Sequence, residues 1–192
     1  MAERENEDRR VRKTKRQLRN ALTSLLLEKD IRRITVRDVA DLADVNRGTF
    51  YAHYSDVYDL LHQLEDDFLV QLDAVGTRHS ARQSDGKSFL YLTDLFAMAS
   101  EYSDIFYTLY CRSGDADFQE KVFNRLKYQY LYEFLSIAGG RESQRLDYCA
   151  SFIVAGMCTL CKVWIENGMQ EPPEAMARLG GEFVLHGLEM LR

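Results

Sequence analysis

Proline is nearly absent from this 192-residue sequence. The chain contains only two prolines, and they are adjacent, at Pro172 and Pro173. Because proline removes a backbone donor and clashes with the preceding helical turn, long stretches without it favour helices. Apolar residues also recur at spacings of three and four, as in Leu18, Leu22 and Leu25, and no strand-like alternation is found. The sequence therefore predicts an all-α fold.

Composition and charge narrow the classes of protein to consider. Hydrophobic residues make up 46% of the chain, which is enough to bury a core and excludes a disordered protein. The net charge of −5 hides an asymmetry between the two ends. Residues 1–50 carry 13 Lys and Arg against 9 Asp and Glu, whereas residues 51–192 carry 12 against 21. We therefore expect any nucleic acid to bind at the N-terminal end.

The sequence gives no sign of export, membrane insertion or cofactor binding. The first residues are charged where a signal peptide needs an apolar segment, and the apolar stretch 151–161 falls short of the ~20 residues that span a bilayer. Four cysteines without a secretion signal predict reduced thiols in the cytoplasm. Cys158 and Cys161 lie inside a helical apolar pattern, so we interpret them as core rather than as a metal or redox site. No glycine-rich phosphate loop or histidine cluster indicates a cofactor or a metal.

The pattern divides the chain into four parts. Residues 1–12 are a charged run that we expect to be a flexible basic arm, and residues 13–54 hold three predicted helices. A longer connecting helix is predicted over residues 55–75. The polar stretch 76–87 contains two glycines and is interpreted as a loop. It opens a helical C-terminal domain that extends to residue 192.

Two helix starts lie close together within the N-terminal part. Thr35 is a predicted N-cap with Asp38 three residues later, and Asn46 is a second N-cap after a turn of about three residues. Two short helices joined in this way form a helix-turn-helix, whose second helix can enter the major groove of DNA. On spacing alone, a small packed subdomain remains the alternative. The second helix offers hydrogen-bonding groups at Asn46, Arg47, Thr49, Tyr51 and His53, while Gly48 allows close approach of the backbone and Phe50 is predicted core.

The residues themselves resemble a known DNA-binding signature. The run from Thr35 to Tyr54, followed by Asp59-Leu-Leu, is similar to the signature of the tetracycline-repressor (TetR) family, and the resemblance covers about residues 13–61. More loosely, Trp164-Ile-Glu-Asn-Gly resembles the C-terminal domain of one subgroup. The resemblance implies a homodimeric regulator whose ligand-binding C-terminal helices control the spacing of two DNA-binding heads. Carried over by position, the implied DNA-binding residues are Thr35, Arg37, Asn46, Arg47, Gly48, Thr49, Tyr51, His53 and Tyr54.

Two positions depart from the family pattern. Asp44 stands in the turn where the family usually has glycine, and aspartate tolerates a left-handed backbone better than most residues. Val57 stands where the family often has lysine, which removes one expected contact with the DNA backbone. Basic residues of the arm could replace that contact by reaching phosphates or the minor groove. They are Arg9, Arg10, Arg12 and Lys13.

The C-terminal domain carries two further hypotheses. Aromatic and thiol side chains within residues 88–166 predict an effector pocket for a largely apolar small molecule, with a solid core as the alternative. Its predicted wall consists of Tyr107, Tyr110, Cys111, Phe123, Tyr130, Phe152 and Trp164. The helix around 149–161 is apolar on all sides, which predicts a subunit interface, with a buried hairpin within the chain as the alternative. The predicted interface residues are Gly180, Gly181, Val184 and Leu188.

Together these features predict a cytoplasmic transcriptional regulator rather than an enzyme. We expect a repressor that binds a pseudo-palindromic double-stranded operator as a homodimer and is released by an unidentified small-molecule effector. An interaction protein that kept this fold, lost operator binding and acts through a partner protein is the alternative. The sequence contains no nucleophile–base pair or carboxylate pair that would support an enzyme.

Overall fold

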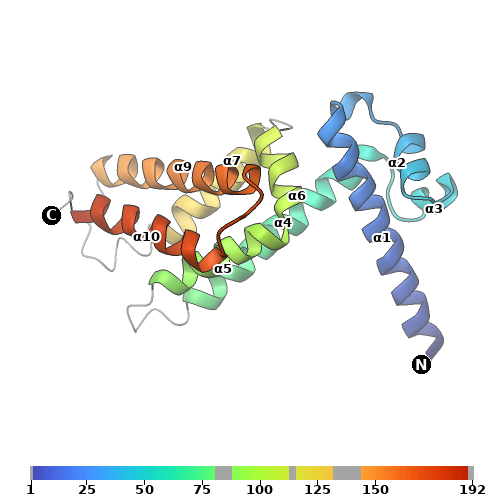
Figure 1. Cartoon of the computed structure of the whole chain (residues 1–192). Coiled ribbons are helices and arrows are strands. Elements are labelled where there is room, and N and C mark those ends of the chain that lie inside the picture. The colour runs from blue at the N-terminus through green and yellow to red at the C-terminus, as the bar shows by residue number, and fades with distance from the viewer. Residues whose placement is uncertain (1, 81–87, 113–115, 132–143, 190–192) are drawn as a thin grey trace.

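The computed structural model describes residues 2–80, 88–112, 116–131 and 144–189. Within these ranges the chain forms helices and turns and contains no strand, which confirms the predicted all-α fold. Figure 1 shows two parts: a head at one end, containing α1, α2 and α3, and a larger helical body. A single long helix, α4, runs from the head into the body. The helices nearest the N-terminus and those nearest the C-terminus therefore lie at opposite ends of the molecule.

The helices of the head follow the predicted order. α2 and α3 are both short, and each ends within two residues of the predicted position. The bounds are α1 Ala2–Glu28, the short 3-10 helix η1 Ile31–Arg33, α2 Val36–Leu42, α3 Arg47–Tyr51 and the connecting helix α4 Val57–Ser80.

The body contains regular α-helices and two segments of wider π-helix, η3 and η4. The π segments continue α6 and α7, where the sequence predicts plain α-helices. The bounds are α5 Ser88–Glu101, α6 Ser103–Phe106, η3 Tyr107–Arg112, α7 Ala116–Asn124, η4 Arg125–Leu131, α9 Gln144–Glu166 and α10 Pro173–Glu189.

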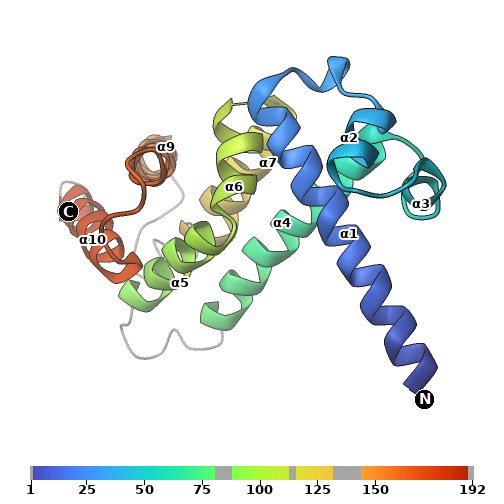
Figure 2. The ribbon, with the colours of Figure 1, turned by 45° about the vertical axis from the view of Figure 1, so that its right-hand side comes forward.

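The N-terminal segment differs from the expected flexible arm, because residues 2–12 form the first turns of α1. Acidic and basic residues alternate here at a spacing that favours a helix, as in Asp8 followed by Arg12 four residues later. No glycine or proline interrupts the run. Figure 2 shows this end of α1 projecting away from both the head and the body.

The connecting helix is longer than predicted. α4 continues through Gly76, which is buried, and ends at Ser80, so the predicted loop over 76–87 begins later. A glycine inside a helix costs up to about 1 kcal/mol relative to alanine. Packing offsets that cost, because Leu69, Leu72 and Val75 of α4 are buried in the core and α4 lies along α5.

The core of the head is closed by side chains from α1, α2, α3 and the connecting helix α4. Leu18 and Leu22 of α1, Val39 of α2, Phe50 of α3 and Leu60 of α4 are fully buried. Each comes from the apolar face predicted by periodicity, and Phe50 is core as expected. This core fixes α2 and α3 against α1 and α4.

The last two helices of the body pair along their length at the end opposite the head (Figure 1). Gly180 of α10 makes this pairing close, because a Cβ there would lie 2.6 Å from Cε of Met157 on α9. α10 also packs extensively against α5, where Met176 and Ala177 are buried.

Residues 147–166 of α9 are long and apolar enough to cross a membrane, by length and composition. The shorter stretch 151–161, considered from the sequence, falls short of that length. Only 28% of that segment is buried within the chain, so α9 leaves much apolar surface uncovered.

Candidate nucleic-acid interface

The entry to α2 is fixed by a reciprocal pair of hydrogen bonds. The Asp38 backbone N–H donates to the Thr35 hydroxyl at 3.2 Å, and the Thr35 backbone N–H donates to Asp38 Oδ2 at 2.9 Å. Lys29 also donates to Asp38 Oδ2, at 3.1 Å. These bonds lower the pKa of Asp38 to about 2, the backbone N–H of Thr35 contributing most. The predicted capping box is confirmed, with an ionised aspartate in place of glutamate.

The turn between α2 and α3 is held by a left-handed residue. Asp44 has a φ of 54°, a conformation that most side chains avoid and aspartate tolerates. The adjacent Val45 N–H donates to the Ala40 carbonyl at 3.0 Å, which closes the turn. The expectation that Asp44 keeps the turn in place of glycine is confirmed.

α3 begins at the predicted cap. Asn46 Oδ1 accepts hydrogen bonds from both the backbone N–H of Thr49, at 2.7 Å, and the Thr49 hydroxyl, at 3.0 Å. Asn46 and Thr49 are therefore engaged in holding the start of the helix. A helix of five residues depends strongly on such a cap, because few internal hydrogen bonds are left to stabilise it.

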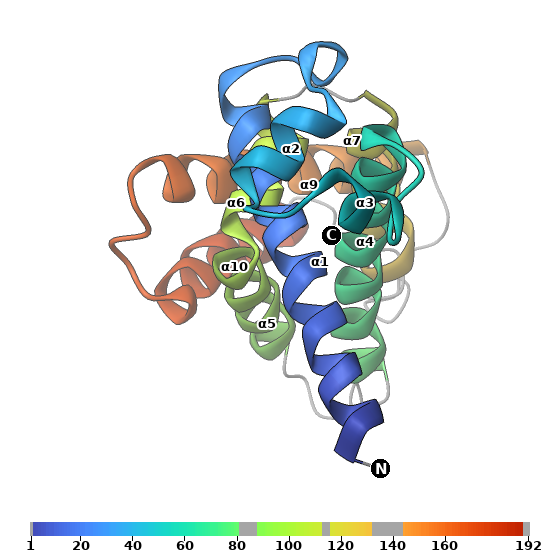
Figure 3. The same cartoon turned by 90° about the vertical axis from the view of Figure 1, so that its right-hand side faces the viewer.

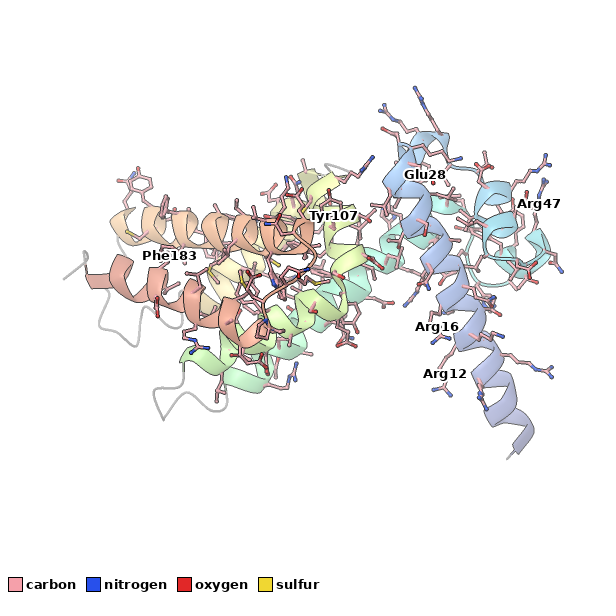
Figure 4. All side chains as sticks on the ribbon, in the orientation of Figure 1. Arg12, Arg16, Glu28, Arg47, Tyr107 and Phe183 are labelled. Carbon is pink, nitrogen blue, oxygen red and sulfur yellow. The ribbon has the colours of Figure 1, made fainter. Side chains whose placement is uncertain are left out.

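The outer surface of α3 carries the predicted DNA-binding groups. Asn46, Arg47, Gly48 and Tyr51 are exposed, and His53 is half-buried beside them. Figure 3 looks directly at the head, with α2 and α3 in front, and Figure 4 shows Arg47 on the side of α3 away from the body. Among the described residues Arg47 makes no ion pair, so its guanidinium is available to a ligand.

Two residues of the signature are buried instead of exposed. Tyr54 was carried over as a DNA-binding residue, but its side chain is 1% exposed and packs against Phe50. Phe50 and Tyr54 are four residues apart, so both point into the core. Val57 is also buried, at 5% exposure. A valine where the family often has lysine therefore fills the core at the start of α4.

Basic side chains surround the head on α1 and α2. Arg37 is exposed on α2 and pairs with Asp41 at 3.4 Å, a surface contact that other charges can displace. Arg9, Arg10, Arg12, Lys13 and Arg16 of α1 cover the part of the helix that extends past the core, although Val11 and Thr14 interrupt them. Figure 4 shows Arg12 and Arg16 projecting from the same side of α1. The head therefore presents positive charge on more than one side.

The predicted effector wall is only partly assembled. Tyr110 stacks on Phe106 at 4.9 Å, and its hydroxyl lies beside the Cys158 thiol. Burial raises the pKa of Cys111 and of Cys158 to about 11, and that of Cys161 to about 12. Such thiols are protonated and unreactive at neutral pH, which agrees with the interpretation of Cys158 and Cys161 as core. The described residues include no group of His, Cys, Asp or Glu suited to a metal ion.

The other members of the predicted wall differ in how far they are buried and in what they contact. Trp164 is buried in the core, where its Nε1–H donates to the Glu171 carbonyl at 3.0 Å and its ring meets Phe96. Phe152 is 81% exposed on the outer side of α9, so it does not face the interior of its own chain. Tyr107 is half-buried on η3 (Figure 4), and Phe123 lies 6.0 Å from the Lys127 ammonium. The side chain of Tyr130 lies outside the described residues.

The predicted subunit-interface residues also divide. Gly180 and Gly181 are buried, and the close approach at Gly180 is made to Met157 of the same chain. Val184 is half-buried, and the Leu188 side chain lies outside the described residues. Their place in a subunit interface therefore stays a prediction.

The predicted interface residues do not include a set of exposed apolar side chains on α9 and α10, which we call the outer stripe. Tyr148 and Phe152 are four residues apart, as are Leu179 and Phe183, so each pair lies on one side of its helix. That spacing was the available signal, but a helix that is apolar all round gives no way to choose the outward side. The outer stripe comprises Tyr148, Phe152, Val163, Leu179 and Phe183.

Both the N-terminal and the C-terminal part of the chain match models of known families. Residues 18–64 match the family described as "Bacterial regulatory proteins, tetR family", and residues 87–184 match a "Transcriptional regulator C-terminal region" of the TetR type. A helix-turn-helix transcriptional regulator of Bacillus subtilis strain 168, YxbF, is 35% identical over 51 residues. That match spans 27% of this chain and 13% of the relative, so the relative is much longer than the part compared.

Solved structures share the fold over nearly the whole chain. A TetR transcriptional regulator from Streptococcus agalactiae 2603V is 27% identical with a TM-score of 0.58, over 93% of this chain and 97% of that one. The fatty acid degradation regulator FadR of Bacillus halodurans has a TM-score of 0.67 at 15% identity, over 91% and 96% of the two chains. FadR of Bacillus subtilis, solved with stearoyl-CoA, has a TM-score of 0.65 at 14% identity, over 89% and 97%. With its helix-turn-helix head and its matching C-terminal region, the chain belongs to the TetR family of DNA-binding transcriptional regulators.

Proposed function

We propose that this regulator represses transcription in the cytoplasm by binding a pseudo-palindromic operator as a homodimer. The observation that carries the proposal is the outer surface of α3. Its polar side chains stand on a capped helix whose opposite face is anchored by Phe50. In helix-turn-helix proteins, such a helix reads base edges in the major groove.

Within this proposal the exposed groups take different roles. Arg47 reaches a base edge, for which a guanidinium offers two donors toward guanine. Tyr51 and His53 lie toward the end of α3, where they meet flanking phosphates. Arg37 and the basic residues 9–13 of α1 contact the DNA backbone, which positions the protein without selecting sequence.

The dimer is supported by the outer stripe. Phe152 and Phe183 are 81% and 68% exposed on the last two helices, and large apolar side chains left exposed are typical of a site of protein contact. Gly156 lies on the same side of α9 as Phe152, and a Cβ there would meet nothing within 4 Å, so a second helix can approach closely. A second copy of the same helix pair provides the matching apolar surface.

Release by a small apolar molecule is supported by the interior of the body. Thr108 is fully buried, and its hydroxyl has no hydrogen-bond partner among the described residues. It lies in η3 beside Tyr110, and short π-helical segments are frequent at functional sites. The fold neighbour from Bacillus subtilis was solved with stearoyl-CoA, a ligand with a long apolar chain. We propose that an apolar effector binds next to η3 and prefers the state that does not bind DNA.

The test begins with selection of duplexes from random-sequence DNA by the wild-type protein. Arg47→Ala should weaken binding to the selected duplex by about 1–3 kcal/mol without unfolding the protein. Arg33→Ala is the matched control, since Arg33 is an exposed arginine of the head on η1, outside α2 and α3. Equal binding by Arg47→Ala and wild type would contradict the assignment of α3 as the reading helix.

The same experiment separates the second candidate function. A protein that acts through a partner and has lost operator binding should select no sequence, even at low salt. Val57 in place of a lysine favours this candidate, because it removes one contact with the DNA backbone. Replacing the basic residues 9–13 by alanine should weaken binding to all sequences and flatten its salt dependence if the protein does bind DNA.

A further inference from the structure

Asn46 and Thr49 are bonded to each other on the surface of α3 that the proposed function places against DNA. Asn46 Oδ1 accepts hydrogen bonds from the Thr49 backbone N–H, at 2.7 Å, and from the Thr49 hydroxyl, at 3.0 Å. Asn46 is exposed, as are the two residues that follow it, and Thr49 is half-buried. The same two side chains therefore hold the start of the helix and belong to the surface that meets base edges.

These two bonds fix the orientation of the Asn46 amide. A backbone N–H can only donate, so the amide atom that faces it is the oxygen and not the nitrogen. The amino group forms the other branch of the planar amide, and within the described part of the chain it donates to no other group. Gly48 leaves room for the amide, since a Cβ there would lie 3.2 Å from Asn46 Oδ1. Asn46 therefore offers DNA its donors, while both lone pairs of its oxygen are used.

The Thr49 hydroxyl has the opposite polarity. An amide oxygen cannot donate, so the hydroxyl hydrogen of Thr49 is directed toward Asn46 Oδ1. A hydroxyl has one hydrogen and two acceptor lone pairs, so only the lone pairs remain for a ligand. Turning the hydrogen toward DNA would give up the bond to Asn46. Thr49 therefore offers DNA an acceptor and no donor.

We propose that Thr49 is a specificity-determining residue, which accepts a hydrogen bond from the exocyclic amino group of one base in each operator half-site. In the major groove adenine and cytosine present such an amino group, whereas guanine and thymine present a carbonyl oxygen. The Thr49 oxygen binds the amino group but meets a carbonyl oxygen with no hydrogen between them. Asn46, which only donates, contacts a neighbouring purine N7 or carbonyl oxygen. The inference deepens the proposed reading of DNA by α3 and rests on it.

Thr49→Val tests this selection, because valine keeps the shape of threonine and removes the acceptor. Duplexes selected by the wild type should carry adenine or cytosine on one strand at one position of each half-site. Guanine or thymine on that strand should weaken wild-type binding at least about fivefold, the usual effect of a mismatched base pair. Thr49→Val should show no such loss. Thr77→Val, in the part of α4 that lies within the body, should keep the wild-type preference.

A base analogue identifies the group that Thr49 contacts. An analogue with the ring of the selected base but without its amino group should weaken wild-type binding by a similar factor. Thr49→Val should bind the natural and the analogue duplex alike, as expected for two groups that act through one bond. The same replacement outside the half-sites is the control.

Asn46→Ser separates reading from capping. Serine caps a helix about as well as asparagine but carries no amide, so the melting temperature should stay the same. Affinity for the selected duplex should fall by roughly threefold to tenfold, the effect of one lost hydrogen bond. The preference of Thr49 for an amino group should remain, since the serine oxygen also accepts from the Thr49 hydroxyl.

Three results would overturn the inference. The first is a Thr49→Val protein with the wild-type preference at every position. The second is wild-type affinity that does not change when the amino group is removed at the position where the two proteins differ. The third is an Asn46→Ser protein whose melting temperature and affinity fall together, because Asn46 would then act only as a cap. A wild-type protein that selects no duplex would instead overturn the proposed function.

Discussion

The head and the body are built from the same kind of helix but differ in how far one chain completes them. In the head, helix starts are capped by side chains at Thr35, Asn46 and Asp56, and the core residues are fully buried. In the body, two π-helical segments interrupt the regular helices, and large apolar side chains such as Phe152 and Phe183 face outward. The head has its helix caps and its core within the chain, whereas the body leaves apolar surface for another molecule.

This difference matches the proposed division of labour. A reading helix has to be held rigidly if its side chains are to match base edges, so short-range caps and a closed core suit the head. A regulatory domain has to respond to ligands and subunits, so irregular helices and exposed apolar surface suit the body. Substitutions in the two parts should therefore have different consequences.

The largest effect is expected from a charge in the outer stripe. Phe152→Glu should produce monomers that keep their helical content, because Phe152 makes little contact within its own chain. Losing the second head should weaken operator binding by at least about 100-fold, since two linked contacts become one. Val70→Glu is the matched control, because Val70 is an exposed apolar residue of α4, outside the outer stripe. A Phe152→Glu protein that stays dimeric would remove the outer stripe from the interface.

A smaller effect is expected from removing the cap of α3. Asn46→Ala should lower the free energy of unfolding by about 1 kcal/mol, the usual contribution of an asparagine N-cap. The same change at the exposed Asn167 in the body should leave stability unchanged. Chemical denaturation of the two variants measures the difference. Equal stability of the two variants would show that α3 does not depend on its cap.

The capping pattern explains why the head was predictable and the body less so. Thr35 with Asp38, and Asn46 with Thr49, act over three residues, so the sequence alone reveals them. Tyr54 was misplaced because the family signature was carried over by position, while its spacing of four from Phe50 places it in the core.

The remaining differences depend on contacts that are distant in sequence. Gly76 stays helical because α4 packs against α5, and Gly180 is buried because Met157 lies opposite it. Phe152 belongs to a helix that is apolar on all sides, so periodicity gave no outward face. The π-helical turns at η3 and η4 have no sequence signal of the kind that caps provide.

A matched pair of buried threonines sharpens the comparison. The Thr23 hydroxyl of α1 donates to the Arg19 carbonyl at 3.0 Å, whereas the Thr108 hydroxyl of η3 has no partner among the described residues. Thr23→Val should therefore cost about 0.5 kcal/mol of stability, and Thr108→Val should cost nothing or stabilise the protein. Thermal unfolding checks both. A clear loss at Thr108 would show that its hydroxyl is satisfied in the folded protein and is not held for a ligand.

The smallest effect is a dependence of head stability on pH. The pKa of Asp38 is about 2, below the ordinary 3.8, so its ionised form supports the folded protein above about pH 4. That support should be lost as the pH falls from about 4 toward 2. Melting temperatures at pH 5 and pH 2.5 should therefore differ less in Asp38→Asn than in the wild type. Equal differences would contradict the role of the ionised carboxylate.

The central claim is that one chain completes the head but not the body. Sedimentation equilibrium of the wild-type protein at micromolar concentration tests it most directly, with the selected duplex added in a second set of cells. The account predicts twice the mass of one chain without DNA and two chains on each duplex with it. A folded wild-type monomer at that concentration, or one chain bound to each duplex, would contradict the account.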